Sequence, residues 1–153
     1  MTLSLSSTAF KDGDKIPARY TCEGPDISPP LAWGEPPEKT QAFALIVDDP
    51  DAPGGIFVHW VLFNVPAGTR RLGEATTTQE QLQNGALQGK TDFGRIGYGG
   101  PCPPRGPAHR YRFILYALDK SVNLKSGASQ EQLLDAMKGH ILAQSQLTGT
   151  YQR

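Results

Sequence analysis

Residues 42–49 read AFALIVDD, and after a short turn residues 56–66 read IFVHWVLFNVP. Both runs are rich in β-branched and aromatic residues and end at or near a proline, which is typical of strands buried on at least one face. Residues 109–119, HRYRFILYALD, begin with two arginines that alternate with Tyr111 and Phe113 and then become wholly apolar. This pattern predicts a third strand that enters the core from an edge.

One segment near the C-terminal end has the pattern of a helix. Ser129 and Gln132 match a capping box, and apolar residues recur at helical spacing through residues 129–144, SQEQLLDAMKGHILAQ. A second, shorter helix is expected over residues 76–85, TTTQEQLQNG. Together with the strands, these segments predict a mainly β fold with one or two peripheral helices.

The composition narrows the class of protein. The chain has 153 residues, which fits a single domain over residues 1–153, and its 15 Lys and Arg balance its 15 Asp and Glu. This balance gives no global field that would favour nucleic acid or an anionic membrane. No apolar run approaches the ~18–20 residues that span a bilayer, and the start of the chain lacks a signal-peptide pattern. We therefore expect a soluble, cytoplasmic protein with no transmembrane segment that binds no nucleic acid.

The chain has two cysteines, Cys22 and Cys102. They could form at most one bridge, across a long loop, which is not the pattern of a small secreted domain built on disulfides. We interpret them as two free thiols. A single bridge is the alternative, because the distance between them cannot be read from the sequence.

Residues 48–60, DDPDAPGGIFVHW, are the first place where polar groups suited to chemistry gather. Asp49 and Asp51 lie on a proline-bounded turn after one predicted strand, and His59 lies on the next. The turn could bring the two carboxylates close to the imidazole.

Residues 97–111, GYGGPCPPRGPAHRY, are the second such place, and they hold four glycines and four prolines. Glycine permits close approach and positive φ, whereas proline fixes φ and removes a donor, so this loop has few conformations. It ends in His109 and Tyr111. The loop is either preorganised to hold a group or is a surface turn between two strands.

Three functional interpretations fit these residues. In the first, backbone N–H groups around Gly99 and Gly100 and the histidines donate to a phosphate or carboxylate, while an aspartate orients the rings. In the second, His59, His109 and the carboxylates bind a metal, although no compact ligand spacing supports this. In the third, an Asp–His pair performs acid–base catalysis, although no nucleophile motif is present. The same groups could instead cap strand ends and satisfy one another.

The ordered set of motifs resembles the phosphatidylethanolamine-binding protein family, also called Raf kinase inhibitor-like proteins. The elements are DPDAP at 49–53, His59 on the following strand and the loop at 97–111, and YTCEG and SPPLAW resemble the short prokaryotic branch. The resemblance implies a β-sandwich-like fold of two antiparallel sheets and a small surface pocket for phosphate, acetate or a phosphorylated head group. Carried over by position, the ligand-binding residues are Asp49, Asp51, His59, Gly100, Pro101, Cys102, His109 and Tyr111.

The resemblance also frames the expected function. We expect a non-enzymatic, homodimeric binding protein without metal or cofactor, which recognises a phosphate- or carboxylate-bearing ligand and modulates a partner in the manner of a kinase inhibitor. Better-studied eukaryotic members have glycine at the position of Cys102 and continue into a C-terminal helix, so the pocket rim should differ here. The alternatives are a hydrolase-type enzyme that uses Asp49 and His59, and a protein-interaction module with a vestigial pocket.

Overall fold

Three long strands form the centre of the structure, and they follow the three apolar runs closely. In the computed structural model, which describes residues 3–153, they are β2 (Ala42–Asp49), β3 (Phe57–Pro66) and β6 (His109–Leu118). β2 pairs antiparallel with β3 on one side and with β6 on the other. Because both edges and both faces of β2 are covered, all eight of its residues are buried.

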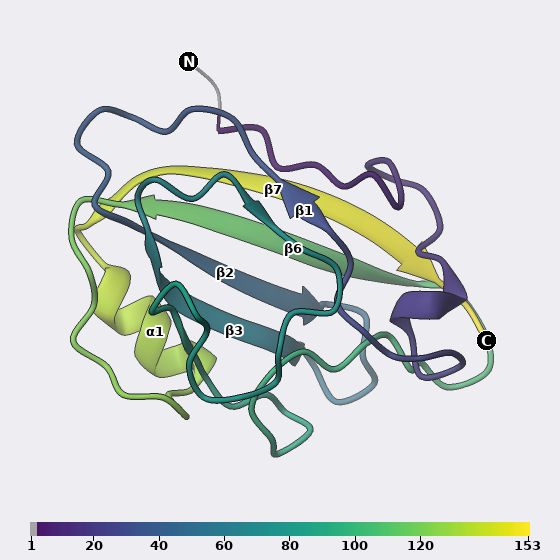
Figure 1. Ribbon diagram of the computed structural model, residues 1–153. Helices are drawn as coiled ribbons and strands as arrows, with labels where there is room; N and C mark the ends of the chain where they lie inside the picture. Colours follow the sequence, from purple (N-terminus) through teal and green to yellow (C-terminus); the bar gives the residue numbers. More distant parts are fainter. Residues whose placement is uncertain (1–2) are drawn as a thin grey trace.

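Two further strands complete this sheet, and a second sheet is much smaller. β7 (Ile141–Tyr151) pairs with β6, and β5 (Leu87–Gln88) pairs with β3, which gives the order β5-β3-β2-β6-β7. β1 (Leu31–Ala32) and β4 (Arg71–Leu72) form a two-stranded antiparallel sheet, and η1 (Ala18–Tyr20) is a short 3-10 helix. The prediction of a mainly β fold with two antiparallel sheets is confirmed (Figure 1).

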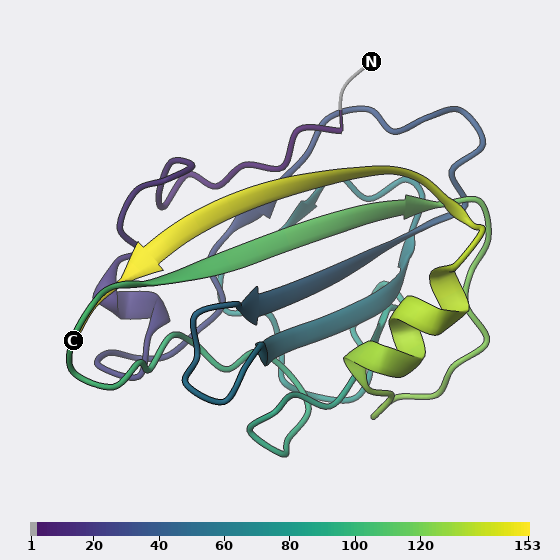
Figure 2. The ribbon, with the colours of Figure 1, turned by 180° about the vertical axis from the view of Figure 1, so that it is seen from behind.

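The core has two parts, one on each face of the five-stranded sheet. Side chains alternate along β2, so Phe43 and Leu45 belong to the larger part and Ala44 and Ile46 to the smaller. The larger part is closed by the segment 3–33 and the two-stranded sheet. Helix α1 (Gln130–Met137) covers the other face, as the view from behind shows (Figure 2).

The C-terminal helix is shorter than its sequence pattern indicated. α1 begins at the predicted capping box of Ser129 and Gln132, but it ends at Met137 instead of continuing to Gln144. Gly139 has a φ of +80°, a left-handed conformation that ends helices and that glycine adopts readily. The prediction of a helix beyond this point was therefore wrong.

Ile141 and Leu142, which fitted the helical spacing, instead begin β7. The strand runs the length of β6, with pairs from His109 and Tyr151 at one end to Leu118 and Ile141 at the other. This tertiary pairing outweighs the local helical pattern. Because β7 is an edge strand, Ile141 and Leu142 are 41% and 37% exposed.

The second helix expected over residues 76–85 is not formed. The buried side-chain amide of Gln88 donates to the carbonyl oxygens of Thr77 and Gln79, each at 2.7 Å. A helix would use those carbonyls for its own backbone bonds, and the three threonines at 76–78 are poor helix formers. The segment is therefore an irregular loop.

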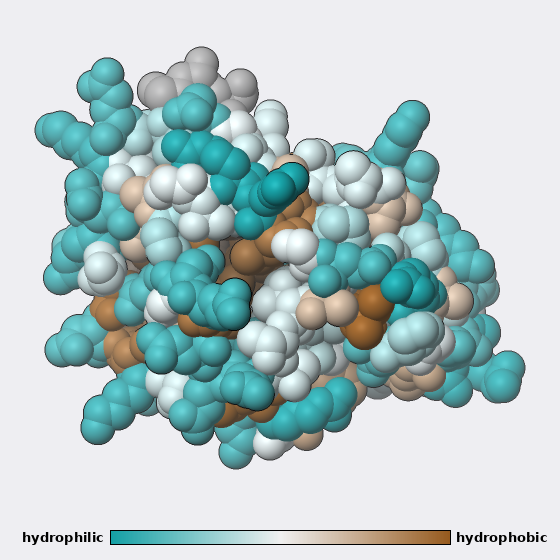
Figure 3. Space-filling view, viewed as in Figure 1, coloured by the Kyte–Doolittle hydropathy of each residue, from teal (hydrophilic) through white to brown (hydrophobic). Residues whose placement is uncertain are grey.

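The surface is mostly polar on the face that Figure 3 shows. Hydrophilic residues cover most of it, and the apolar areas are small and separate. Scattered apolar area of this kind is ordinary for a folded protein. Within residues 3–153, no helix combines the length and the apolar composition needed to cross a bilayer.

Candidate ligand pocket

The predicted polar residues come together at one edge of the sheet, where the end of β2 lies beside the starts of β3 and β6. Asp49 is the last residue of β2, His59 lies near the start of β3, and His109 and Tyr111 begin β6. Since β2 is antiparallel to both neighbours, its last residue lies beside their first residues, as the pairing of Asp49 with Phe57 shows. The sheet thus gathers side chains that are far apart in the sequence.

These side chains line a cavity of about 130 Å³. The volume is below the roughly 300–1,000 Å³ of pockets for drug-sized ligands, and it equals about four water molecules at ~30 Å³ each. The cavity therefore has the size of a small head group. Its lining residues are Asp49, Ala52, Pro53, Phe57, His59, Phe93, Cys102, Pro103, Pro104, His109 and Tyr111.

Three of the predicted site residues do not line the cavity, and Asp51 is one of them. It accepts hydrogen bonds at 2.8–2.9 Å from the backbone N–H and the guanidinium of Arg110. The side-chain hydrogen bond from Arg110 is the main cause that lowers the pKa of Asp51 to about 2. Asp51 therefore anchors the turn after β2 to the start of β6.

Gly100 and Pro101 lie behind the pocket wall, against the N-terminal segment. A Cβ on Gly100 would lie 2.1 Å from the carbonyl oxygen of Tyr20, so only glycine fits there. The N–H of Gly100 donates to Asp26 at 2.8 Å, and the N–H of Gly99 donates to a backbone carbonyl oxygen. Both N–H groups are thus already bonded within the protein. The interpretation that they form an anion-binding concavity was wrong.

His59 is 4% exposed, and its ring lies among aromatic rings. The ring centroids of Phe57, Phe93 and Tyr111 are 5.1–5.3 Å from its own. Its Nδ1 lies 2.7 Å from the carbonyl oxygen of Gly99 and must carry the hydrogen, because a carbonyl only accepts. Burial lowers the pKa of His59, despite nearby groups that favour the charged form. In the neutral ring, Nε2 is therefore an acceptor.

His109 forms the other polar wall with Asp49. Its Nδ1 lies 2.7 Å from Oδ2 of Asp49, and both side chains are buried. The other carboxylate oxygen accepts the backbone N–H of Asp51 at 2.7 Å. The carboxylate accepts from Nδ1–H, so it sets the tautomer of the ring and leaves Nε2 for a ligand.

Tyr111 contributes a donor. Its side chain is 1% exposed, and its hydroxyl has no hydrogen-bond partner within residues 3–153. Burial first, and then the charge of Asp49, raises the pKa of Tyr111, so the hydroxyl keeps its proton. A buried hydroxyl without a partner costs about 1–3 kcal/mol, which an acceptor on a ligand would offset.

The cavity therefore presents one donor and two ring nitrogens whose role depends on protonation. The neutral ring of His59 offers a lone pair on Nε2, and this atom donates to an anion only after it gains a proton. This refines the expectation that the histidines are simple donors. A ligand hydroxyl, such as that of a protonated phosphate group, would satisfy the same lone pair.

The second interpretation from the sequence was a metal site built on the histidines and carboxylates. Within the part of the chain that the structure describes, no group of three or more His, Cys, Asp and Glu side chains is placed to hold a metal ion. Asp49 instead uses one carboxylate oxygen for His109 and the other for a backbone N–H.

Cys22 and Cys102 form a disulfide, which corrects the expectation of two free thiols. They are 80 residues apart in the sequence, but the fold places their Cα atoms 5.4 Å apart, within the range that a bridge requires. The N–H of Cys22 also donates to the carbonyl oxygen of Pro101 at 3.1 Å. The bridge thus ties the Pro/Gly loop to the N-terminal segment at the wall of the pocket.

The apolar walls were not predicted from the sequence. Phe57 precedes His59 by two residues on β3, so strand alternation could have placed both on one face. Phe93 comes from an irregular loop and left no such signal. Its ring packs against His59 and Phe57 and adds to the apolar lining of the pocket.

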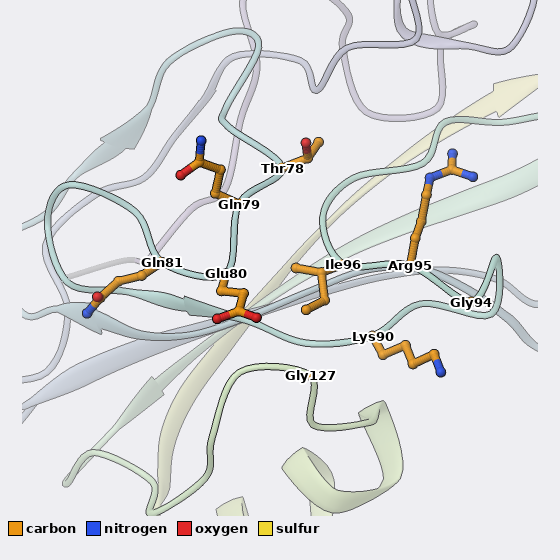
Figure 4. Close-up of a pocket in the computed structure, with 9 residues that line it drawn as sticks. All are labelled: Thr78, Gln79, Glu80, Gln81, Lys90, Gly94, Arg95, Ile96 and Gly127. Atoms are coloured by element: carbon orange, nitrogen blue, oxygen red, sulfur yellow. The ribbon is translucent and has the colours of Figure 1, made fainter.

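A second, wider hollow of about 920 Å³ lies elsewhere on the surface (Figure 4). Its side chains do not converge: Lys90 and Arg95 extend away from Glu80, and Ile96 lies between them. All four polar residues at 78–81 are exposed. The small cavity is therefore the better candidate site.

A mainly β domain with a small pocket at the ends of its central strands, lined by apolar side chains and a few polar ones, has the architecture of a ligand-binding protein. A family model described as phosphatidylethanolamine-binding protein (PEBP) matches residues 6–152. The chain belongs to this family, which confirms the resemblance of its motifs.

Individual relatives agree with this assignment. A UPF0098 protein of Methanothermobacter thermautotrophicus is 48% identical over 151 residues, covering 99% of each chain, and one of Chlamydia muridarum is 42% identical with the same coverage. The solved structure of CT736 from Chlamydia trachomatis, described as a PEBP homolog, has a TM-score of 0.89 at 42% identity and covers 97% of this chain and 96% of its own. E. coli YBCL, described as a new member of the mammalian PEBP family, has a TM-score of 0.91 at 32% identity, covering 99% and 98%.

Proposed function

We propose that the protein is a non-enzymatic binding protein whose small pocket takes the oxyanion group of a phosphate- or carboxylate-bearing ligand. The observation that carries this proposal is a mostly apolar cavity whose lining residues include three polar side-chain atoms that have no hydrogen bond within residues 3–153. They are the hydroxyl of Tyr111 and the Nε2 atoms of His59 and His109. Buried polar groups need partners, so a ligand that bonds all three gains affinity and orientation.

The protonation state of the pocket residues limits which oxyanions can bind. His59 is neutral at rest, because burial lowers its pKa, and the carboxylate of Asp49 adds a negative charge beside His109. A fully deprotonated dianion would be repelled by the lone pair on Nε2 of His59 and by the negative charge of Asp49. The pocket therefore favours an oxyanion that brings a proton, such as a monoprotonated phosphate ester, or one that binds as a ring takes up a proton.

The experiment that tests this proposal is a calorimetric titration with phosphate, O-phosphoethanolamine and acetate. We expect saturable binding with one site per chain for at least one of these probes. If none of them binds at millimolar concentration, the oxyanion pocket is refuted.

We further propose the wider setting of this activity. The protein would act as a single domain in the cytoplasm, as a homodimer, and it would modulate a protein partner when the pocket is filled. The family to which the chain belongs supports a binding role. Sedimentation at several protein concentrations tests the dimer directly.

The Asp49–His109 contact supports a second candidate, general-base catalysis. An imidazole oriented by a carboxylate can activate water or a hydroxyl. The pair differs from the one expected, since Asp49 hydrogen-bonds His109 and not His59. Turnover of a phosphate or carboxylate ester that disappears in His109→Asn would favour this candidate over simple binding.

A further inference from the structure

The Cys22–Cys102 bridge lies at the surface and at the pocket at the same time. Both cysteines are exposed, and Cys102 also lines the cavity. Disulfides that are open to solvent are the ones that external thiols reach, whereas structural bridges are usually protected. Breaking this bridge would therefore alter the pocket wall directly, because Cys102 is part of that wall.

A guanidinium lies beside the two sulfur atoms. Nη1 of Arg153 is 3.2 Å from Sγ of Cys102 and 3.8 Å from Sγ of Cys22. A neighbouring arginine stabilises a thiolate, which makes a cysteine both a better leaving group and a more reactive thiol. Since Arg153 is nearer to Cys102, a thiolate at Cys102 would be the more stabilised of the two.

Other contacts hold the same two segments together without the bridge. The hydroxyl of Tyr98 donates to the carbonyl oxygen of Tyr20 at 2.7 Å, and the N–H of Gly100 donates to Asp26 at 2.8 Å. The bridge could therefore open without unfolding the loop. Its opening would change the sulfur atoms and the wall around them locally.

We propose that the Cys22–Cys102 disulfide is a thiol-exchange site whose reduction by a dithiol weakens ligand binding in the adjoining pocket. A thiolate of the dithiol attacks Sγ of Cys22, the S–S bond breaks, and its electron pair leaves on Sγ of Cys102 beside Arg153. The second thiol of the reductant, as thiolate, then displaces Cys22, which takes up a proton. The protein gains two electrons, and the dithiol becomes a cyclic disulfide.

Reduction acts on the pocket through charge. A thiolate at Cys102 adds a second negative group to a cavity that already contains the carboxylate of Asp49. Like charges disfavour an oxyanion, so the oxidised protein is the form that binds it. In a cytoplasmic protein an exposed disulfide of this kind would be a redox sensor, because stable bridges are rare in that compartment. This effect on the ligand depends on the binding function proposed above.

The experiment treats the folded protein with dithiothreitol and follows two readouts. Alkylation by iodoacetamide and mass spectrometry count the free thiols, and calorimetry measures the affinity for phosphate and acetate before and after reduction. We expect complete reduction while the circular dichroism spectrum stays native, and an affinity at least about fivefold lower. A bridge that resists dithiothreitol until the protein unfolds would overturn the exchange site, and equal affinity in the two forms would overturn the coupling.

Failure of the proposed function has a separate signature. If the oxidised protein binds none of phosphate, O-phosphoethanolamine and acetate, the oxyanion pocket is refuted, and the alkylation rate of the native protein still decides whether the exchange site exists. Arg153→Gln should slow the reduction of the disulfide in the native protein several-fold. Arg105→Gln, which changes an arginine on the same loop as Cys102, should not slow it. An unchanged rate in Arg153→Gln would contradict the role of the guanidinium.

Two serine variants separate the effect of a thiolate charge at Cys102 from the effect of losing the disulfide. Both Cys22→Ser and Cys102→Ser lack the bridge, but only Cys22→Ser keeps an ionisable sulfur in the pocket wall. We expect weaker binding of acetate by Cys22→Ser than by Cys102→Ser, with the difference growing as the pH rises. Identical affinities would show that the charge of Cys102 has no effect on the ligand.

Discussion

The Nδ1 atom of His59 lies 2.7 Å from the carbonyl oxygen of Gly99, and this contact sets the chemistry of the pocket. The carbonyl fixes the hydrogen on Nδ1, while burial lowers the pKa of His59 and keeps the ring neutral. The atom offered to a ligand is therefore a lone pair on Nε2. An oxyanion can bond it only together with a proton.

Oxyanion binding should accordingly take up protons. Acetate keeps its charge between about pH 6 and pH 8, so any pH dependence of its binding belongs to the protein. The pKa of free His59 is lowered, and a bound anion raises it again, so affinity should increase as the pH falls. The limit is about tenfold per pH unit for one proton.

Calorimetry in buffers of different ionisation enthalpy measures the proton uptake directly. An affinity that is independent of pH, with no proton exchanged, would show that neither ring is protonated with the anion.

Replacing a pocket histidine by asparagine should separate binding from folding. The asparagine amide can still donate to Gly99 in His59→Asn, or to Asp49 in His109→Asn, but it has no counterpart of Nε2. We expect affinity to fall at least about tenfold, or ~1.4 kcal/mol, in either variant. The free energy of unfolding should fall by only about 1–2 kcal/mol, from lost packing.

The matched control is His140→Asn. His140 also bonds an aspartate through Nδ1, at 2.9 Å from Asp119, but it does not line the cavity. Its replacement should leave affinity unchanged. Equal losses in all three variants would indicate a general effect on stability instead of a site.

Tyr111→Phe should weaken binding without weakening the fold. The buried hydroxyl has no partner within residues 3–153, so its removal loses no internal hydrogen bond. We expect an unfolding free energy that is unchanged or higher, and an affinity several-fold lower. Tyr98→Phe is the opposite case, because that hydroxyl donates to Tyr20, and it should cost about 1 kcal/mol of stability. Urea unfolding and the same titrations measure both variants.

Asp51 should contribute to stability in a defined range of pH. Its pKa is lowered from 3.8 to about 2, so the unfolded state binds the proton first as the pH falls. Its contribution is therefore full above about pH 4 and is lost towards pH 2. The effect should be modest, because Arg110 is largely exposed. Unfolding curves of the wild type and Asp51→Asn should converge across this window, and a constant gap would contradict the assignment.

The central strands could be predicted because long apolar runs dominate them. β2, β3 and β6 match the runs at 42–49, 56–66 and 109–119 to within a residue. β7 could not be predicted, because Gln144, Ser145 and Gln146 break its apolar pattern. Its first residues also continue the helical spacing of α1. Its pairing with β6, and with residues 13–16 near its end, decides its conformation.

The lining of the candidate pocket was predictable in part for similar reasons. Asp49, His59 and His109 follow from the ends of predicted strands and the family motifs. The choice between Asp49 and Asp51 depends on which carboxylate Arg110 engages, which the sequence does not reveal. The Cys22–Cys102 bridge depends on the packing of segments 80 residues apart, and no local pattern reports such a distance.

The most direct test of the central claim is long-range proton–nitrogen NMR of the three histidine rings during titration with phosphate. The Nε2 signal of His59 should begin at the value for an unprotonated nitrogen, and the Nε2 signals of His59 and His109 should both move saturably towards the hydrogen-bonded range, while those of His140 stay fixed. Signals of His59 and His109 that do not move at saturating phosphate would contradict the account of an oxyanion pocket built on these two nitrogens.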